Sequence, residues 1–167
     1  RFSISPKRNG CTWLKNLVDS SKSTTTAVPA TINTAQEQKP MRRILALDAI
    51  SNAANMGSIL RTAAAFSIDA IILSDDCCDA WYRQSVRVSL GHVVTVPTLR
   101  VADLLESGLT NDDRKVNGLT GLLRWLRGQN IQCFAAVAHD DRDKTSYPPL
   151  VALENESYHH SWCVVLG

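Results

Sequence analysis

Apolar residues form short runs after residue 41, and these runs alternate with longer amphipathic stretches. The short runs predict buried β-strands, because strands covered on both faces read as nearly continuous apolar sequence; they lie at 44–47, 70–73, 93–96, 131–138 and 162–166. The longer stretches predict helices at 57–66, 81–90, 101–105 and 119–126. Alternating strands and helices predict an α/β fold with a mostly parallel sheet and flanking helices.

The first of these helices has a periodic pattern. Ile59, Ala63 and Phe66 have the spacing of one helix face and are expected to face the core. Asn55 or a neighbour is expected to cap the N-terminus of the helix. Gly57, which lies close to that end, is expected to let the backbone approach a ligand or the neighbouring strand.

The N-terminal part of the chain follows a different pattern. Residues 11–18 are compatible with a short amphipathic turn or helix, whereas 20–40 are rich in Ser, Thr, Ala and Gln and have no apolar period. Residues 1–43 carry eight Lys and Arg against two acids. We therefore divide the chain into a flexible basic segment at 1–40 and a folded domain at 41–167. The basic segment is a solvated leader, an arm that contacts phosphates or a remnant of a mitochondrial transit peptide.

Composition narrows the class of protein. A hydrophobic content of 44% with 20% charged residues is ordinary for a globular protein, and no window approaches the length of a transmembrane helix. The five cysteines contain no C-x-x-C pair, which favours a reducing, intracellular compartment. Neither Cys77–Cys78 nor the histidines have the spacing of a metal site, so no metal is expected. Cytoplasm, nucleolus and mitochondrion all remain open.

The loop between the first strand and the first helix carries the most informative chemistry. Asn52, Asn55 and Gly57 place side-chain amides and backbone N–H groups at a helix N-terminus. Such an end is well suited to hold a phosphate or a ribose. Arg61 adds a fixed positive charge with five donors a turn further on.

This stretch, LDAISNAANMGSILRTAAAF at 47–66, resembles the first signature of the SpoU/TrmH family of RNA ribose 2′-O-methyltransferases. The matching residues are Asn52, Asn55, Gly57, Leu60, Arg61, Thr62, Ala63, Ala65 and Phe66. The resemblance continues through AIILSDD, SVRVSLGHVVTVPTLRV, IQCFAAVAHDD and SWCVVLG, and it covers roughly 42–167. Ala53 and Ser67 depart from it, since many relatives have Pro and Gly there.

The resemblance implies S-adenosylmethionine-dependent methylation of a ribose 2′-hydroxyl in tRNA or rRNA, by a homodimer with the knotted SPOUT fold. In the family, the arginine at the position of Arg61 is catalytic. A guanidinium holds its proton to very high pH, so we favour electrostatic stabilisation of the developing alkoxide over proton abstraction. Asn55 is expected to orient the ribose or Arg61. A plain surface arginine and a plain helix cap are the structural alternatives.

The resemblance also assigns a surface to RNA and another to the methyl donor. Asn52, Arg83, Arg87 and Ser89 are expected on the RNA side, although a solvated helix face explains the two arginines equally well. By family position, Leu166 and Gly167 begin the wall of the S-adenosylmethionine pocket, and Ala138 is expected to line it. Ordinary core and turn positions are the alternative for these three residues.

The family has further signatures after the strand that ends in Leu-Gly: a Glu-Gly turn, a Pro-rich segment and a Ser-Leu-Asn-Val-Ser helix. They supply most of the donor pocket and form the knot, and none follows Gly167. We therefore expect a methyltransferase domain that is incomplete at its C-terminus, self-associates, binds the donor weakly or not at all and is inactive alone. The alternatives are a non-catalytic RNA-binding or assembly protein that keeps the front half of the fold, and a nucleotide-binding α/β domain, although no phosphate-loop motif is present.

Overall fold

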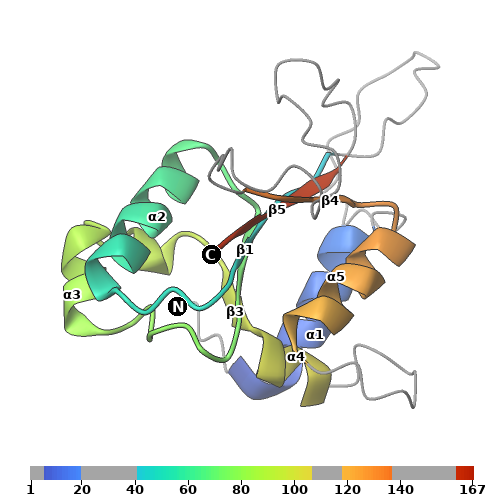
Figure 1. Ribbon diagram of the computed structural model, residues 1–167, viewed down its shortest axis with the longest axis horizontal. Helices are drawn as coiled ribbons and strands as arrows, with labels where there is room; N and C mark the ends of the chain where they lie inside the picture. Colours follow the sequence, from blue (N-terminus) through green and yellow to red (C-terminus); the bar gives the residue numbers. More distant parts are fainter. Residues whose placement is uncertain (1–5, 20–40, 107–117, 137–160) are drawn as a thin grey trace, which may run out of the picture.

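A parallel five-stranded sheet forms the centre of the protein (Figure 1). The computed structural model describes residues 6–19, 41–106, 118–136 and 161–167. Within these, the strand order is β3-β2-β1-β5-β4 and every pairing is parallel. The strands are β1 (Arg43–Leu47), β2 (Ala70–Leu73), β3 (Thr98–Arg100), β4 (Gln132–Ala135) and β5 (Trp162–Leu166). The predicted α/β fold with a parallel sheet is confirmed.

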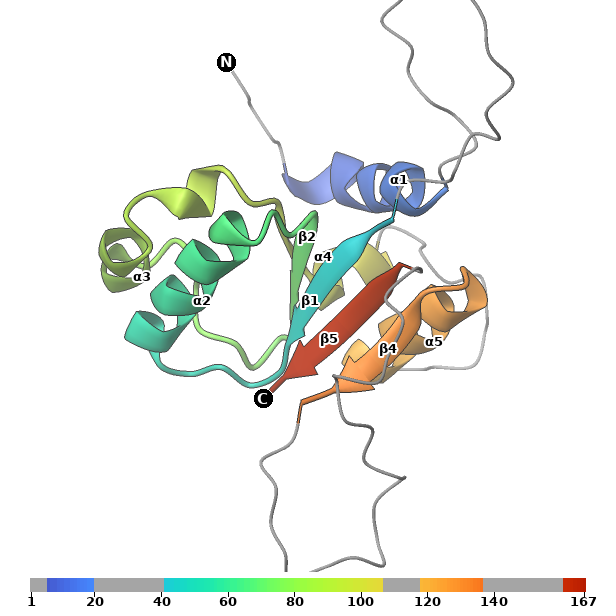
Figure 2. The ribbon, with the colours of Figure 1, turned by 90° about the horizontal axis from the view of Figure 1, so that it is seen from above.

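Helices cover both faces of this sheet (Figure 2). One face packs against α1 (Pro6–Val18), α4 (Val101–Glu106) and α5 (Leu119–Gly128). The other packs against α2 (Ala53–Ala65), α3 (Arg83–Val88) and the 3₁₀ turn η1 (His92–Val94). Successive side chains of a strand point to opposite faces, so Ile44 and Ala46 of β1 enter the first core while Leu45 and Leu47 enter the second.

The N-terminal helix belongs to the folded body. Cys11, Leu14 and Val18 recur on one face of α1, and all three are buried in the first core. The expected flexible segment at 1–40 is therefore wrong for the part that forms α1, and packed structure begins before residue 41. Residues 20–40 lie outside the described residues.

The strand expected at 93–96 is instead a helical turn. Val93 and Val96 are buried while Val94 is 72% exposed, which is the pattern of a helical turn and not of a strand covered on both faces. Gly91 starts the turn at φ 84°, and the Thr95 hydroxyl donates to the His92 carbonyl at 2.9 Å. The β-branched run suggested a strand, but Pro97 follows it and β3 begins only afterwards.

Several element boundaries also differ from the prediction. The helix expected at 81–90 is the shorter α3, and α2 begins four residues earlier than the expected 57. Because α2 ends at Ala65, Phe66 lies beyond the helix and is 68% exposed, so the expectation that it faces the core is wrong. Residues 137–138 of the strand expected at 131–138 fall outside the described residues.

Candidate functional site

The start of α2 is fixed by a side-chain cap. The Asn52 side-chain oxygen accepts hydrogen bonds from the backbone N–H groups of Ala54 at 2.8 Å and Asn55 at 3.1 Å. Asn52 has the extended backbone of an N-cap residue, with φ −85° and ψ 116°. Asn52 is therefore the cap, and Asn55 lies inside the first helical turn with its side chain exposed.

The loop that leads from β1 to this cap is held by the segment after β2. Ala49 adopts a left-handed backbone with φ 52°, and its N–H donates to the buried Ser74 hydroxyl at 3.0 Å. The N–H of Cys78 donates to the Ile50 carbonyl at 2.9 Å. Two independent hydrogen bonds thus set the path of the loop at the carboxyl edge of the sheet, where ligands of parallel α/β proteins bind.

Ser74 was missed by the sequence prediction. Its signal is a polar residue placed directly after an apolar strand, where the hydroxyl becomes buried but still needs a partner. The backbone of the β1–α2 loop supplies that partner.

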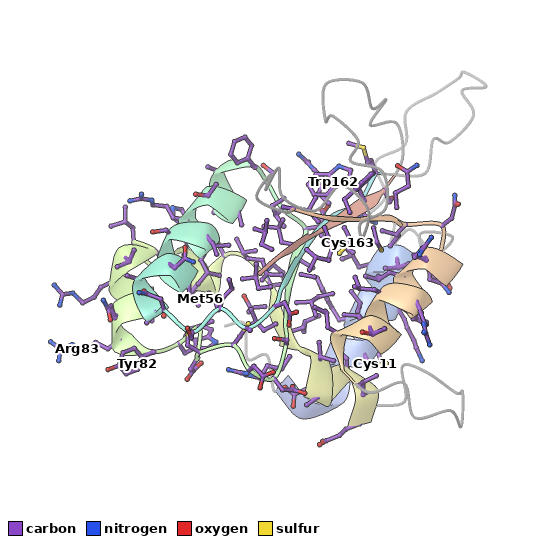
Figure 3. All side chains as sticks on the ribbon, viewed as in Figure 1. Cys11, Met56, Tyr82, Arg83, Trp162 and Cys163 are labelled. Carbon is purple, nitrogen blue, oxygen red and sulfur yellow. The ribbon has the colours of Figure 1, made fainter. Side chains whose placement is uncertain are left out.

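Helix α2 presents three different sides. Met56, Leu60 and Ala63 are buried against the sheet, and Met56 points inward from the helix (Figure 3). Gly57 faces α3, so closely that an added Cβ would lie 2.7 Å from the Ser85 carbonyl oxygen. The expected close approach at Gly57 is therefore real, but the neighbour is a helix and not a strand or a ligand.

Arg61 lies one turn after Gly57, on the same edge of α2 that faces α3. Its side chain is exposed, and in the described part of the chain no carboxylate pairs with it. A guanidinium in this position keeps its five donors available for an incoming anion. The described geometry therefore gives Arg61 no structural ion pair, and its catalytic role stays a prediction.

Asn55 and Arg61 are not on one face of the helix. Six residues separate them, which places their side chains about 120° apart around the axis, and no hydrogen bond between these two described residues is present. Asn55 is therefore positioned to contact a ligand at the helix end independently of Arg61, and the geometry gives no support to a direct orienting contact between them.

Arg83 and Arg87 lie one turn apart on the outer face of α3, and both are exposed. Arg83 extends away from the sheet (Figure 3). Ser89, which was grouped with them as an RNA contact, is fully buried, and its hydroxyl donates to the Val86 carbonyl at 2.9 Å. That expectation needs correction, because Ser89 faces α2 and is used in the packing of the two helices.

Leu166 and Gly167, which were expected at the methyl donor, lie beside the start of the β1–α2 loop, whereas α2 begins at the other end of this loop. The N–H of Asp48 donates to the Leu166 carbonyl at 2.8 Å, and a Cβ on Gly167 would lie 3.4 Å from the Asp48 carbonyl oxygen. Leu166 is half-buried, whereas Gly167 and Asp48 are exposed. The ends of β1 and β5 therefore meet here. Ala138 lies outside the described residues.

An apolar groove of about 430 Å³ opens on the third side of α2, away from α3. It runs between the helix and the sheet and is lined by Arg43, Leu45, Ser58, Ile59, Thr62, Ala63, Phe66, Ile68, Trp162 and Leu166. Leu166 alone of the predicted site residues touches it. The groove is therefore separate from the edge that carries Arg61.

The described residues form neither a metal cluster nor a membrane-spanning helix. No group of three His, Cys, Asp or Glu side chains there is placed to hold a metal ion. None of the described helices combines the length and the apolar character needed to cross a bilayer.

Cys133 and Cys163 are paired across neighbouring strands of the first core. A hydrogen bond between the two thiols lowers the pKa of Cys133 and raises the pKa of Cys163, and burial raises the pKa of Cys163 further. Burial is also the main reason that the pKa of Cys78 is raised. Cys163 is fully buried, and Cys133 is half-buried.

These shifts predict the order of thiol alkylation. The thiolate is the reactive form, so a lowered pKa moves the labelling midpoint of Cys133 to lower pH and a raised pKa moves that of Cys78 to higher pH. Cys163 should stay unmodified in the folded protein. Mass spectrometry after iodoacetamide treatment across a pH series measures the midpoints of Cys133 and Cys78, and unfolding in urea should bring the midpoints of all three cysteines together near the ordinary value. Labelling of Cys78 at lower pH than Cys133 would contradict this assignment.

Comparison with known proteins places this geometry in a family. An uncharacterized tRNA/rRNA methyltransferase of Mycobacterium tuberculosis is 42% identical over 69 residues, which cover 41% of this chain and 24% of that protein. The 23S rRNA (guanosine(2553)-2′-O)-methyltransferase RlmP of Bacillus subtilis is 34% identical over 59 residues, which cover 35% of this chain and again 24% of the relative. The chain thus spans well under half the length of these curated relatives.

A solved structure supports the same fold. The crystal structure of an AdoMet-bound rRNA methyltransferase from Sinorhizobium meliloti matches with a TM-score of 0.54 at 23% identity, over 75% of this chain and 39% of that one. At this identity the likeness establishes the arrangement of sheet and helices alone. A family model described as the SpoU rRNA Methylase family matches residues 42–167, which are most of the chain. The protein therefore belongs to the SpoU rRNA methylase family.

Proposed function

We propose that this protein methylates a ribose 2′-hydroxyl of tRNA or rRNA, with S-adenosylmethionine as the methyl donor. The observation that carries the proposal is the presentation of Arg61. The guanidinium is exposed in the second half of α2, on the edge that faces α3, and it is not engaged by a described carboxylate; the capped start of this helix lies at the carboxyl edge of the parallel sheet. Family membership and the AdoMet-bound relative support the same chemistry.

The described residues fit one side of a donor site. Leu166 offers an apolar surface, Gly167 carries no side chain, and the exposed Asp48 carboxylate beside them can accept hydrogen bonds from sugar hydroxyls. When bound there, S-adenosylmethionine supplies an electrophilic methyl group on a sulfonium. The chain's own contribution is to form this wall and to hold the loop that separates it from α2.

Arg61 acts on the hydroxyl that is methylated. As the oxygen forms its bond to the methyl carbon, its proton has to leave to water or to a phosphate of the RNA, and negative charge develops on the oxygen. A guanidinium close to that oxygen stabilises the charge without giving up its own proton. Asn55 at the helix end hydrogen-bonds the ribose or a phosphate, and Arg83 and Arg87 provide outer contacts to the RNA backbone. Homodimer formation remains a prediction.

A non-catalytic RNA-binding protein is the second candidate. The observation that favours it is that Arg61, Arg83 and Arg87 are all exposed on α2 and α3, which provides basic contacts for RNA without a donor site. Such a protein would bind RNA through the same arginines without transferring a methyl group.

Incubation with methyl-labelled S-adenosylmethionine and total cellular RNA separates the two candidates. The protein used is the product of the whole reading frame, with the 167-residue chain tested in parallel. We expect ribonuclease-sensitive label with the whole product and no label in DNA. RNA binding without any incorporated label would support the non-catalytic candidate and overturn the enzymatic one.

A further inference from the structure

Two large aromatic side chains are exposed immediately before α3. Trp81 and Tyr82 are each 59% exposed, although Ala80 directly before them is buried. The turn that presents them is well defined: the N–H of Trp81 donates to the Asp79 carboxylate at 2.9 Å, and the N–H of Tyr82 donates to the Asp79 carbonyl at 3.1 Å. Two adjacent exposed aromatic side chains on a fixed turn are unusual at a protein surface, and they indicate a binding site for a ligand.

The surroundings of this pair are basic. Arg83 follows directly, and Arg87 lies one turn further along the outer face of α3. Both arginines are exposed, and among the described residues neither has a carboxylate partner. The carboxylate of Asp79 accepts the backbone N–H of Trp81. We name the surface formed by Trp81, Tyr82, Arg83 and Arg87 the aromatic–basic platform.

The platform lies on the same side of the sheet as Arg61. Helix α3 packs directly on α2 (Figure 2). The contact is made at Gly57, and Arg61 follows Gly57 by one turn on the same edge. Tyr82 and Arg83 are placed on the outer side of α3 (Figure 3). A strand of RNA that rests on the platform therefore passes the helix pair that carries the proposed catalytic guanidinium.

We propose that Trp81 and Tyr82 stack on unpaired bases of the RNA substrate, while Arg83 and Arg87 bind the adjacent phosphates. This inference rests on the proposed function and deepens it, because it identifies the substrate as a single-stranded or loop segment. Aromatic side chains interleaved with arginines bind unpaired nucleotides, since stacking needs an exposed base face and a duplex hides those faces. The positive charge of the platform is complementary to a phosphate backbone. An apolar protein partner would not require this charge.

Fluorescence anisotropy with two RNA probes tests the platform without any methyl donor. The probes are an unstructured 12-mer and a duplex of the same length, each bound to the product of the whole reading frame. The double variant Trp81→Ala/Tyr82→Ala should bind the unpaired probe at least tenfold more weakly, on the scale of one lost base stack or more. Its affinity for the duplex should stay within about twofold, as expected when only stacking is lost. The variant Trp81→Phe/Tyr82→Phe retains the ring faces and should restore most of the affinity for the unpaired probe.

The arginines should behave differently from the aromatics. The variant Arg83→Ala/Arg87→Ala should weaken both probes and should lower the slope of log affinity against log salt by about 1.4 for the unpaired probe, at about 0.7 per lost phosphate contact. Phe66→Ala removes a similarly exposed aromatic side chain (68%) outside the platform and serves as the matched control, with unchanged affinity. Circular dichroism melts should confirm that each variant keeps its fold, because all four side chains are exposed.

Unchanged affinity of the double alanine variant for the unpaired probe would overturn the inference, as would an equal loss for the duplex. Altered sedimentation with unchanged RNA binding would also overturn it, and would identify the platform as a contact between protein chains. Each of these results leaves methyl transfer untouched. Conversely, failure of methyl transfer with intact stacking would overturn the proposed function alone.

Discussion

Replacing Arg61 with alanine should lower the rate constant for methyl transfer by about 10²–10³-fold, the range seen when one preorganised donor to a developing oxyanion is removed. The side chain is exposed and makes no ion pair among the described residues, so the melting temperature should not change. The loss should appear in kcat as well as in kcat/KM, because the interaction strengthens only as charge develops. Single-turnover methylation of a saturating RNA substrate measures this directly.

Two companion variants sharpen the experiment. Arg61→Lys keeps the charge but loses the forked donors, and it should recover only part of the rate. Arg124→Ala removes an exposed arginine from α5, on the other face of the sheet, and should leave the rate unchanged. A normal rate for Arg61→Ala would remove the proposed role of this residue. Equal losses of methylation rate in Arg61→Ala and Arg124→Ala would indicate a general effect of the protein's positive charge.

Replacing Gly57 with alanine should destabilise the protein by about 1–3 kcal/mol, the usual cost of overpacking a close contact. The added Cβ would lie 2.7 Å from both the Ser85 carbonyl oxygen and the Val88 Cβ, and 3.1 Å from the Ser89 backbone nitrogen. Two of these atoms are backbone, so relief requires α2 and α3 to move apart. For a chain of this size, the melting temperature should fall by roughly 2–4 °C per kcal/mol, and activity should fall because the helix that carries Arg61 shifts.

Gly128→Ala is the matched control for this substitution. Gly128 is the last residue of α5, and a Cβ there would meet no atom within 4 Å. Alanine is the better helix former, so thermal unfolding should show an unchanged or slightly raised melting temperature. Equal changes in melting temperature at the two positions would contradict the proposed packing effect. A Gly57→Ala variant that melts at the temperature of the parent protein would contradict it as well.

Sequence patterns predicted the central architecture well because buried parallel strands are apolar throughout. The strands at 70–73 and 162–166 were predicted with the boundaries that the structure shows. The same reasoning failed at Val93–Val96, where β-branched residues form part of a helical turn that begins at the left-handed Gly91. A run of four residues is too short for its periodicity to separate the two cases. The burial of Leu14 in the first core was missed because it depends on tertiary packing of a short amphipathic segment.

The candidate site was predicted less completely than the fold. The signature placed Arg61 on the helix that starts at the sheet edge, and that helix is present in the structure. Sequence could not decide whether Asn52 or Asn55 caps the helix, because both amides are able to do so and only the hydrogen bonds distinguish them. Nor could it show that Ser89 faces inward, since this follows from the contact of α3 with Gly57. The roles of Arg61, Asn55 and the donor-side residues remain predictions.

The most direct test of the central claim is the chemical position of the transferred methyl group. RNA methylated with isotopically labelled donor is digested to nucleosides, and tandem mass spectrometry then separates the base fragment from the sugar fragment. We expect the labelled methyl group to stay with the ribose as a 2′-O-methyl nucleoside, and we expect Arg61→Ala to remove this product. A labelled methyl group on the base fragment would contradict the account.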